Sequence, residues 1–171
     1  MKGYIQVYTG NGKGKTTAAF GLSLRAVGAG KRVFFAQFVK GKHYSEIEAV
    51  QRLLPAITVK QYGRGCFIVN APTQADIDMA RQGLKEVSRV IASGEYDVVI
   101  LDEANIALHY RLFTVDELIH TIKSKPEATE VIVTGRNAPP QLVEIADLVS
   151  EMREVKHYYT QGVDARVGIE F

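Results

Sequence analysis

The chain has 171 residues, 46% of them hydrophobic and 23% charged, and a formal net charge of +2 at pH 7. This composition excludes a disordered or fibrous protein and predicts one globular domain over residues 1–171, and the weak positive charge gives no support for a nucleic-acid partner. Cys66 is the single cysteine, which excludes an internal disulfide, and no apolar run approaches the roughly 20 residues that cross a bilayer. Since the first expected strand begins within a few residues of Met1, we expect no signal or transit peptide, and we expect a cytoplasmic protein without a membrane segment.

Strands and helices are expected to alternate along the chain, in the order typical of a parallel sheet covered by helices. The expected strands cover residues 3–8, 33–38, 57–61, 98–101, 131–133, 148–155 and 167–171. The expected helices cover residues 15–28, 45–54, 73–94 and 114–123, and a further one can begin at Pro139-Pro140. Residues 62–72 are rich in glycine and show no clear periodicity, so they are expected to form a loop.

Local patterns mark where some of these elements begin and how they are buried. Thr73 with Asp76, and Thr114 with Glu117, have the spacing of residues that cap the start of a helix. The run over residues 98–101 is apolar without alternation, which predicts a strand that is covered on both faces.

The segment between the first strand and the first helix has the features of a P-loop, which binds the phosphates of a nucleotide. Its glycines let the backbone curl so that successive N–H groups point into one concavity, at the positive end of the following helix. Lys15 supplies a mobile charge for phosphate oxygens, and the Thr16 hydroxyl can bind Mg²⁺. The loop is one residue tighter than the usual pattern, because Thr9 stands where the first glycine is expected. The predicted nucleoside triphosphate site consists of Thr9, Gly10, Asn11, Gly12, Lys13, Gly14, Lys15, Thr16 and Thr17.

An acidic pair, Asp102 and Glu103, directly follows the apolar strand. Carboxylates at the carboxyl end of a strand beside the P-loop strand are placed to bind Mg²⁺ on the phosphates, because Mg²⁺ takes oxygen ligands. We therefore predict a Mg²⁺ (or Mn²⁺) site formed by Thr16, Asp102 and Glu103. The alternative is that the acidic pair only caps the next helix, which is also common. Arg136 follows another expected strand at the same edge of the sheet, where it either reaches the phosphate chain or is a solvated loop charge.

The sequence offers no arrangement of a protein nucleophile and its base. Cys66 has no evident activating partner. The histidines show no metal-ligand spacing and are expected to be solvated or on the surface of a helix; they are His43, His109, His120 and His157.

Several motifs together resemble those of one family of P-loop enzymes. They are residues 8–21, 37–41, 101–103, 134–136, 146–157 and 162–171. The most distinctive are the P-loop without its first glycine and the run Ser-Glu-Met-Arg-Glu-Val-Lys-His that ends at His157. Over essentially the whole chain, these motifs resemble the P-loop type of ATP:corrinoid adenosyltransferase. That family transfers the 5′-deoxyadenosyl group of ATP to the Co(I) of a reduced corrinoid such as cob(I)alamin and releases triphosphate, in adenosylcobalamin biosynthesis or salvage.

The resemblance implies an α/β fold of the RecA-like P-loop NTPase type, with a mostly parallel central sheet flanked by helices, in a homodimer. It also implies that ATP lies in the loop in the reverse sense, so that C5′ faces the corrinoid. Co(I) is then the nucleophile and no protein base is required, while a reducing flavoprotein is the implied transient partner. Lys13, Lys15, Arg136 and Mg²⁺ would stabilise the charge on the departing triphosphate, with Lys15 and Arg136 as the catalytic residues.

The resemblance further implies that the corrinoid binds near residues 62–70. Family members carry two aromatic residues there, which are thought to displace the lower axial ligand of cobalt. Phe67 matches the first of these, whereas Ile68 or Val69 stands in the place of the second. We expect Phe67 to contact the corrinoid, the alternative being that its side chain is buried under the loop.

Two other functions compete with adenosyl transfer. A small-molecule kinase or ATPase would need a residue that orients the acceptor, and usually an arginine-rich lid, neither of which the sequence shows. An ATP-dependent nucleic-acid-binding or motor domain would need a basic stripe with aromatic residues for stacking, whereas the basic residues here are scattered.

Overall fold

The computed structural model describes residues 2–41, 44–65, 68 and 71–171. In this part of the chain the centre is a six-stranded sheet in which every neighbouring pair of strands is parallel. The strands are β1 (Ile5–Thr9), β2 (Val33–Lys40), β3 (Ile57–Gly65), β4 (Val98–Asp102), β5 (Glu130–Thr134) and β6 (Leu148–Glu151). Their order across the sheet is β3-β2-β4-β5-β1-β6.

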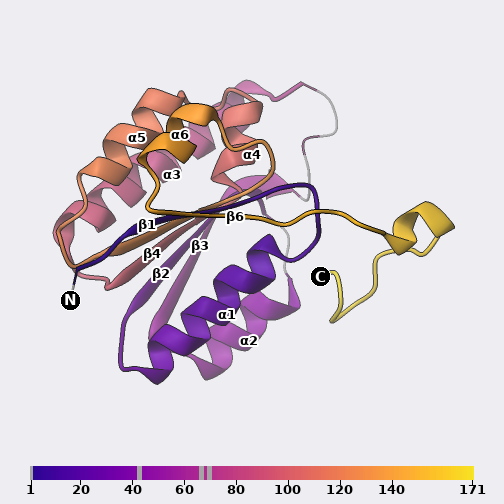
Figure 1. The fold of residues 1–171 in the computed structure, drawn as a ribbon, viewed down its shortest axis with the longest axis horizontal. Helices are drawn as coiled ribbons and strands as arrows, with labels where there is room; N and C mark the ends of the chain where they lie inside the picture. The colour runs from indigo at the N-terminus through magenta and orange to yellow at the C-terminus, as the bar shows by residue number, and fades with distance from the viewer. Residues whose placement is uncertain (1, 42–43, 66–67, 69–70) are drawn as a thin grey trace.

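Helices cover both faces of this sheet, as Figure 1 shows, with α1 and α2 on one face and α3 to α6 on the other. The helices are α1 (Lys15–Gly28), α2 (Ser45–Leu53), α3 (Gln74–Ser93), α4 (Ala104–His109), α5 (Val115–Lys123) and α6 (Pro140–Ile145), followed by the short 3-10 helix η1 (Tyr158–Gln161). None of the helices in the described ranges is long and apolar enough to cross a membrane. The fold is thus the predicted α/β arrangement of a parallel sheet flanked by helices.

The core consists of one apolar layer on each face of the sheet. Along β2, Phe34 and Phe38 face the layer under α3, whereas Phe35 faces α1 and stacks on Phe20 with ring centroids 3.9 Å apart. Every residue of β4 is buried. This double burial explains why the sequence of β4 is apolar without alternation.

The predicted helix starts are confirmed by their caps. The Thr73 side chain accepts a hydrogen bond from the Asp76 backbone N–H, and Thr114 accepts one from Glu117 in the same way. In both cases the acidic side chain accepts from the backbone N–H of the threonine, which completes the capping box. Pro140 is the first residue of α6, where its missing N–H costs no hydrogen bond.

One expectation about the sheet is wrong. We expected the strand that ends in Asp102 to lie beside the P-loop strand, but β5 lies between β4 and β1. The carboxyl end of β4 still reaches the P-loop, because α1 begins above it and the Thr16 hydroxyl donates to Asp102 Oδ1 at 2.9 Å.

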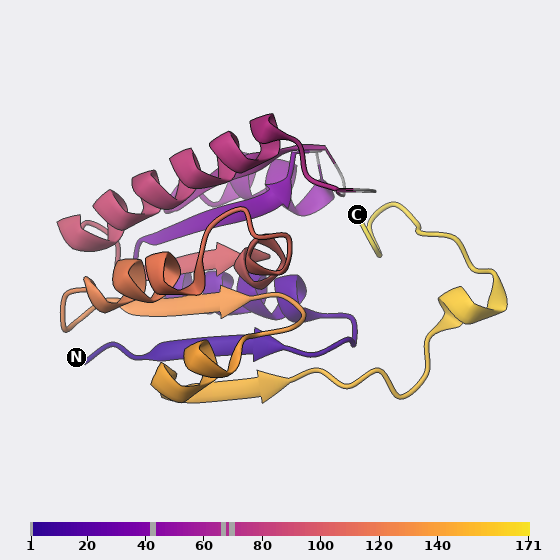
Figure 2. The same cartoon turned by 90° about the horizontal axis from the view of Figure 1, so that it is seen from above.

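The two ends of the sheet also differ from expectation. β3 continues to Gly65, so the loop expected over residues 62–72 begins later. β6 ends at Glu151 instead of residue 155, because its partner β1 ends at Thr9, opposite Glu151. Residues 167–170 form a turn where a strand was expected over residues 167–171, and the Glu170 N–H donates to the Arg166 carbonyl. Seen from above in Figure 2, the chain after β6 runs away from the sheet and its end turns back toward the carboxyl edge of the strands.

Candidate functional site

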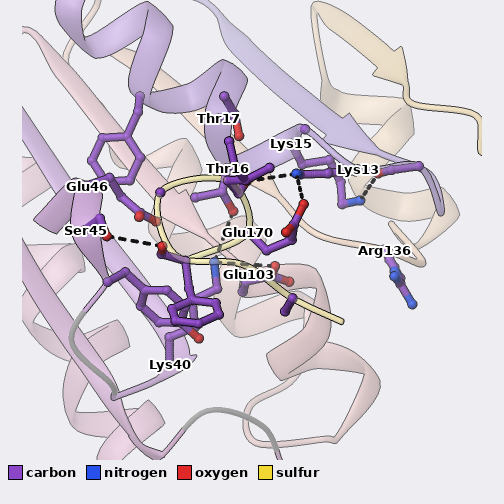
Figure 3. A pocket seen from close by; sticks show the side chains of 18 of the residues that line it. Lys13, Lys15, Thr16, Thr17, Lys40, Ser45, Glu46, Glu103, Arg136 and Glu170 are labelled. Atoms are coloured by element: carbon purple, nitrogen blue, oxygen red, sulfur yellow. Dashed lines mark hydrogen bonds and ion pairs between the residues drawn. The ribbon is translucent and has the colours of Figure 1, made fainter. Parts of the chain in front are cut away.

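The described part of the chain has a cavity of about 990 Å³ at the carboxyl edge of the sheet. Its walls come from the P-loop and the start of α1, from the end of β2 and the start of α2, and from the C-terminal segment (Figure 3). Of the residues predicted to bind nucleotide or metal, those that line it are Asn11, Gly12, Lys13, Gly14, Lys15, Thr16, Thr17, Glu103 and Arg136. The fold therefore brings the P-loop, one of the acidic residues and the arginine to one cavity.

The P-loop is shaped by backbone contacts with the segment that follows β6. The Gly12 N–H donates to the Met152 carbonyl at 2.6 Å, so this N–H points out of the loop and not into a common concavity. A Cβ atom on Gly10 would lie 2.5 Å from the same carbonyl oxygen, and Gly10 has a φ of 93°. Gly14 has a φ of 118° at the start of α1. The glycines are thus required by close backbone approach and by positive φ.

Thr9, which replaces the usual first glycine, has a structural contact in this loop. Its hydroxyl oxygen accepts a hydrogen bond from the Ala138 N–H at 3.2 Å. Thr9 therefore ties the P-loop to the segment that carries Arg136, whose side chain is exposed at the rim of the cavity.

Lys15 is a buried cation within the loop. The residue is only 7% exposed, and its ammonium donates to the Gly10 and Gly12 carbonyl oxygens at 2.8 Å each. Burial lowers the pKa of Lys15. The charges of Glu103 and Asp102 raise this pKa, and those of Arg136 and Lys40 lower it further. No carboxylate pairs with Lys15 among the described residues. The helix that follows has no acidic residue in its first turn and no side-chain cap, so this end of the cavity is suited to an anion.

Asp102 is the centre of a hydrogen-bond network beneath the loop. It is fully buried, and its Oδ1 accepts from the hydroxyls of Thr16 at 2.9 Å and Thr134 at 2.6 Å. Its Oδ2 accepts from the Gln37 amide and the Lys40 ammonium, each at 3.2 Å. Four donors from three elements, α1, β2 and β5, thus fix this carboxylate in place.

Glu103 differs from Asp102 in its surroundings. Its side chain is 21% exposed and lies 3.8 Å from the Lys40 ammonium. Burial and the neighbouring charge of Asp102 raise the pKa of Glu103. Glu103 does occupy the N-cap position of α4, but its side chain makes no capping hydrogen bond and its φ is 59°. The alternative in which the acidic pair only caps a helix therefore does not describe Glu103.

The oxygen set at this point suits a magnesium ion. The Thr16 hydroxyl and Asp102 Oδ1 are hard oxygen donors 2.9 Å apart, and the Glu103 carboxylate is beside them. The described ranges contain no cluster of three or more histidine, cysteine or acidic residues that would form a complete metal cage. Mg²⁺ is typically held by one or two carboxylates together with substrate phosphates and water, so the donors present fit this ion.

Lys13 points away from the loop toward the C-terminal segment. Its ammonium donates to Glu170 Oε1 at 2.6 Å and to the Ile169 carbonyl at 2.8 Å. The hydrogen bond and charge of Glu170 raise the pKa of Lys13. Figure 3 shows Glu170 between the P-loop lysines and the wall that carries Ser45 and Glu46. The charge of one P-loop lysine is therefore neutralised by a carboxylate of the C-terminal segment.

Sequence reasoning missed several residues of the cavity. Lys40 and Glu170 were not predicted as site residues, although both lie in motifs that carry the family resemblance. His157, which was also not predicted as a site residue, lines the cavity. Phe67, the predicted corrinoid contact, lies outside the described residues.

Comparison with known proteins places the chain in one family. The family model described as "ATP:corrinoid adenosyltransferase BtuR/CobO/CobP" matches residues 1–171. The chain therefore belongs to the ATP:corrinoid adenosyltransferase family. Corrinoid adenosyltransferases similar to it occur in Pseudomonas aeruginosa, with 37% identity over 99% of this chain and 84% of the relative, and in Escherichia coli K12, with 36% over 99% and 86%. The corrinoid adenosyltransferase CobA of Salmonella typhimurium is 37% identical over 99% of this chain and 86% of its own length.

A solved structure supports the fold class of this adenosyltransferase family member. The flagellar accessory protein FlaH from Methanocaldococcus jannaschii superposes with a TM-score of 0.60, covering 88% of this chain and 71% of FlaH. At 15% identity the likeness concerns the fold alone, which is that of the RecA-like P-loop NTPases.

Proposed function

We propose that this chain transfers the 5′-deoxyadenosyl group of ATP to the cobalt of a reduced corrinoid such as cob(I)alamin and releases inorganic triphosphate. The observation that carries the proposal is the buried Lys15 ammonium in a shortened P-loop, without a carboxylate partner among the described residues, in a member of the adenosyltransferase family. An anion as highly charged as triphosphate is the natural ligand of such a site.

The chemistry needs no protein base. The cobalt of Co(I) donates an electron pair to C5′ of ATP, so that a Co–C bond forms while the C5′–O bond breaks. The bonding electrons of C5′–O leave with the triphosphate, and cobalt becomes Co(III). Lys15 and Arg136 both line the cavity, and their positive charges support a role in stabilising the leaving group.

The residues of the site then divide into two groups. Lys13, Lys15 and Arg136 would bind the triphosphate, with the remaining loop residues Thr9, Gly10, Asn11, Gly12, Gly14, Thr16 and Thr17 around it. Thr16, Asp102 and Glu103 would hold Mg²⁺ (or Mn²⁺), which supplies positive charge to the departing triphosphate. The reversed sense of ATP is supported by the departure of the loop from the usual pattern, in which Thr9 stands in place of the first glycine and accepts a hydrogen bond from the Ala138 N–H.

Several finer points belong to the same proposal. We infer that the chain acts as one nucleotide-binding domain over residues 1–171, as a homodimer in the cytoplasm. A reducing flavoprotein would deliver the electron that generates Co(I), and Phe67 would contact the corrinoid.

One experiment tests the reaction directly. The protein is mixed with MgATP and chemically reduced cobalamin, and the light-sensitive adenosylated product is followed by absorbance. Phosphorus NMR should detect one triphosphate for each corrinoid converted. Release of ADP or of phosphate without adenosylated product would instead assign the chain to the small-molecule kinases or ATPases.

A further inference from the structure

Strand β2 carries a strained backbone bulge just before it reaches the cavity. Its register with β3 shifts between Phe38 and Lys40, and Val39 has a φ of 66°. A positive φ is a strong outlier for a β-branched residue, and such strain is maintained only where the surrounding structure enforces it.

The bulge reverses which face of the sheet the last residues of β2 address. In a regular strand, Lys40 would share the face of Ala36 and Phe38, which pack in the apolar layer under α3. Instead, Val39 packs in that layer beside Phe38, and Lys40 faces Thr16 of α1 on the opposite side. A bulge that turns one side chain toward a functional site is a recurrent device in sheets.

Two glycines make the bulge possible. A Cβ atom on Gly63 would lie 2.4 Å from the Val39 carbonyl carbon, and one on Gly41 would lie 2.1 Å from the Gly63 carbonyl oxygen. The backbones of β2 and β3 therefore approach more closely here than any side chain would allow.

The bulge places the Lys40 ammonium among the groups assigned to the metal. Its Nζ lies 3.1 Å from Thr16 Oγ1, 3.2 Å from Asp102 Oδ2 and 3.8 Å from Glu103 Oε1. The Tyr44 ring is also near, with its centroid 5.5 Å from the ammonium. Figure 3 shows Lys40 and Glu103 together on the floor of the cavity. One lysine thus makes the contacts that a divalent cation would make at these oxygens.

We propose that Lys40 is a positioning residue that occupies the cation position of Asp102, Glu103 and Thr16 until Mg²⁺ arrives with the triphosphate, and then moves onto the triphosphate. The inference rests on the proposed function for the identity of the ligand. Two cations cannot share the Asp102 carboxylate without strong repulsion, since charges about 4 Å apart interact strongly in a partly buried site. Lys40 lines the same cavity as Lys15 and Arg136, so its ammonium has an anion site to move into.

The proposal gives opposite expectations for two titrations. Without nucleotide, Mn²⁺ binding measured by electron paramagnetic resonance should be about tenfold tighter in Lys40→Met than in the unmodified chain, because the competing charge is gone. Binding of inorganic tripolyphosphate with Mg²⁺, measured by calorimetry, should be about tenfold weaker in the same variant. Lys40→Arg, which keeps the charge, should stay within a few-fold of the unmodified chain in both.

The controls separate this role from a purely structural one. Lys85→Met removes the same charge from an exposed position of α3 and should leave both titrations unchanged. If Lys40→Met does not fold, as judged by circular dichroism, Lys40→Gln keeps a hydrogen-bond donor for Asp102 and should show the same two changes. Mn²⁺ binding that is unchanged or weaker in the folded variant would overturn the proposal. Neither titration uses a corrinoid. Both can therefore be interpreted even if the chain does not transfer an adenosyl group.

Discussion

At the scale of single residues, the site is governed by charges held away from water. Lys15 illustrates this most clearly, because its ammonium is bound by two backbone carbonyls of its own loop. Carbonyl oxygens compensate only part of the cost of burying a full charge. A bound phosphate would complete that compensation. Lys15 should therefore bind the triphosphate most strongly when the negative charge on the triphosphate is greatest.

Replacement of Lys15 tests this point. Lys15→Ala should lower kcat/KM for adenosylation by an amount equal to about 2–4 kcal/mol of transition-state stabilisation, the loss typical of a preorganised donor. Steady-state kinetics with pre-reduced corrinoid measure it, with Lys85→Ala as the control for a surface lysine. Near-normal kcat/KM in Lys15→Ala would show that this lysine does not act on the leaving group.

The two carboxylates of the acidic pair should respond differently to neutral substitution. Asp102→Asn leaves the Lys40 ammonium without its buried partner and should lower the free energy of unfolding by about 3–5 kcal/mol. Glu103→Gln removes a charge that burial and Asp102 already disfavour, so the free energy of unfolding should change little. The Mg²⁺ concentration that this variant needs for turnover should rise. Denaturant unfolding and Mg²⁺ titration of turnover measure the two effects. Equal loss of stability in both variants would contradict this division.

At the scale of elements, the contact between β2 and β3 determines where Lys40 lies. Gly63→Ala places a Cβ atom against the Val39 backbone and should destabilise the fold by about 1–3 kcal/mol, as overpacking does. Gly65→Ala is the matched control, because a Cβ atom there meets no atom of the described residues within 4 Å. Thermal unfolding of the two variants measures the difference. A loss as large in Gly65→Ala would mean that strand flexibility, and not close approach, sets the cost.

The capping box of α5 gives a pH dependence with a definite sign. The backbone N–H of Thr114 donates to the Glu117 carboxylate and is the main reason that its pKa lies below the ordinary 4.5. A lowered folded pKa means that the ionised carboxylate stabilises the fold above pH 4.5, and that this contribution is lost as the pH falls through the folded pKa.

Glu117→Gln should therefore be less stable than the unmodified chain at pH 7, by roughly 0.5–1 kcal/mol for an exposed cap. The difference should shrink as the pH falls below 4.5 and vanish once the native carboxylate is protonated. Urea unfolding of both proteins between pH 7 and pH 3 measures it. A difference that grows on acidification would contradict the assigned role of Glu117.

At the scale of the whole molecule, the sequence predicts those structural features that depend on a local pattern of residues. The central strands, the capped helices and the sequence of the P-loop all have patterns of a few residues, and the structure contains each element. Lys40 could not be predicted, because its direction depends on a bulge that needs Gly41, just after β2, and Gly63 of β3. The predicted position of β4 beside β1 was also wrong. Nothing in the residues of β4 indicates that β5 lies between these two strands.

The C-terminal segment closes the cavity through contacts that span almost the whole chain. Glu170 pairs with Lys13, and the Ser45 hydroxyl donates to the Phe171 carbonyl. Figure 2 shows that this segment has left the sheet before it returns, so its place depends on these few polar contacts. Since Glu170 neutralises a P-loop lysine, a triphosphate must replace it to gain Lys13.

Glu170→Gln tests this competition. The variant frees Lys13 and also removes a negative charge from the cavity wall, so both effects favour an anion. Inorganic tripolyphosphate should bind about two- to fivefold tighter than in the unmodified chain, the range expected of an exposed ion pair, and the gain should fall as salt is raised. Calorimetry at low and high ionic strength measures it, with Glu154→Gln, an exposed position of the same segment, as the control. Weaker binding in Glu170→Gln would mean that this carboxylate orders the cavity for the triphosphate instead of competing with it.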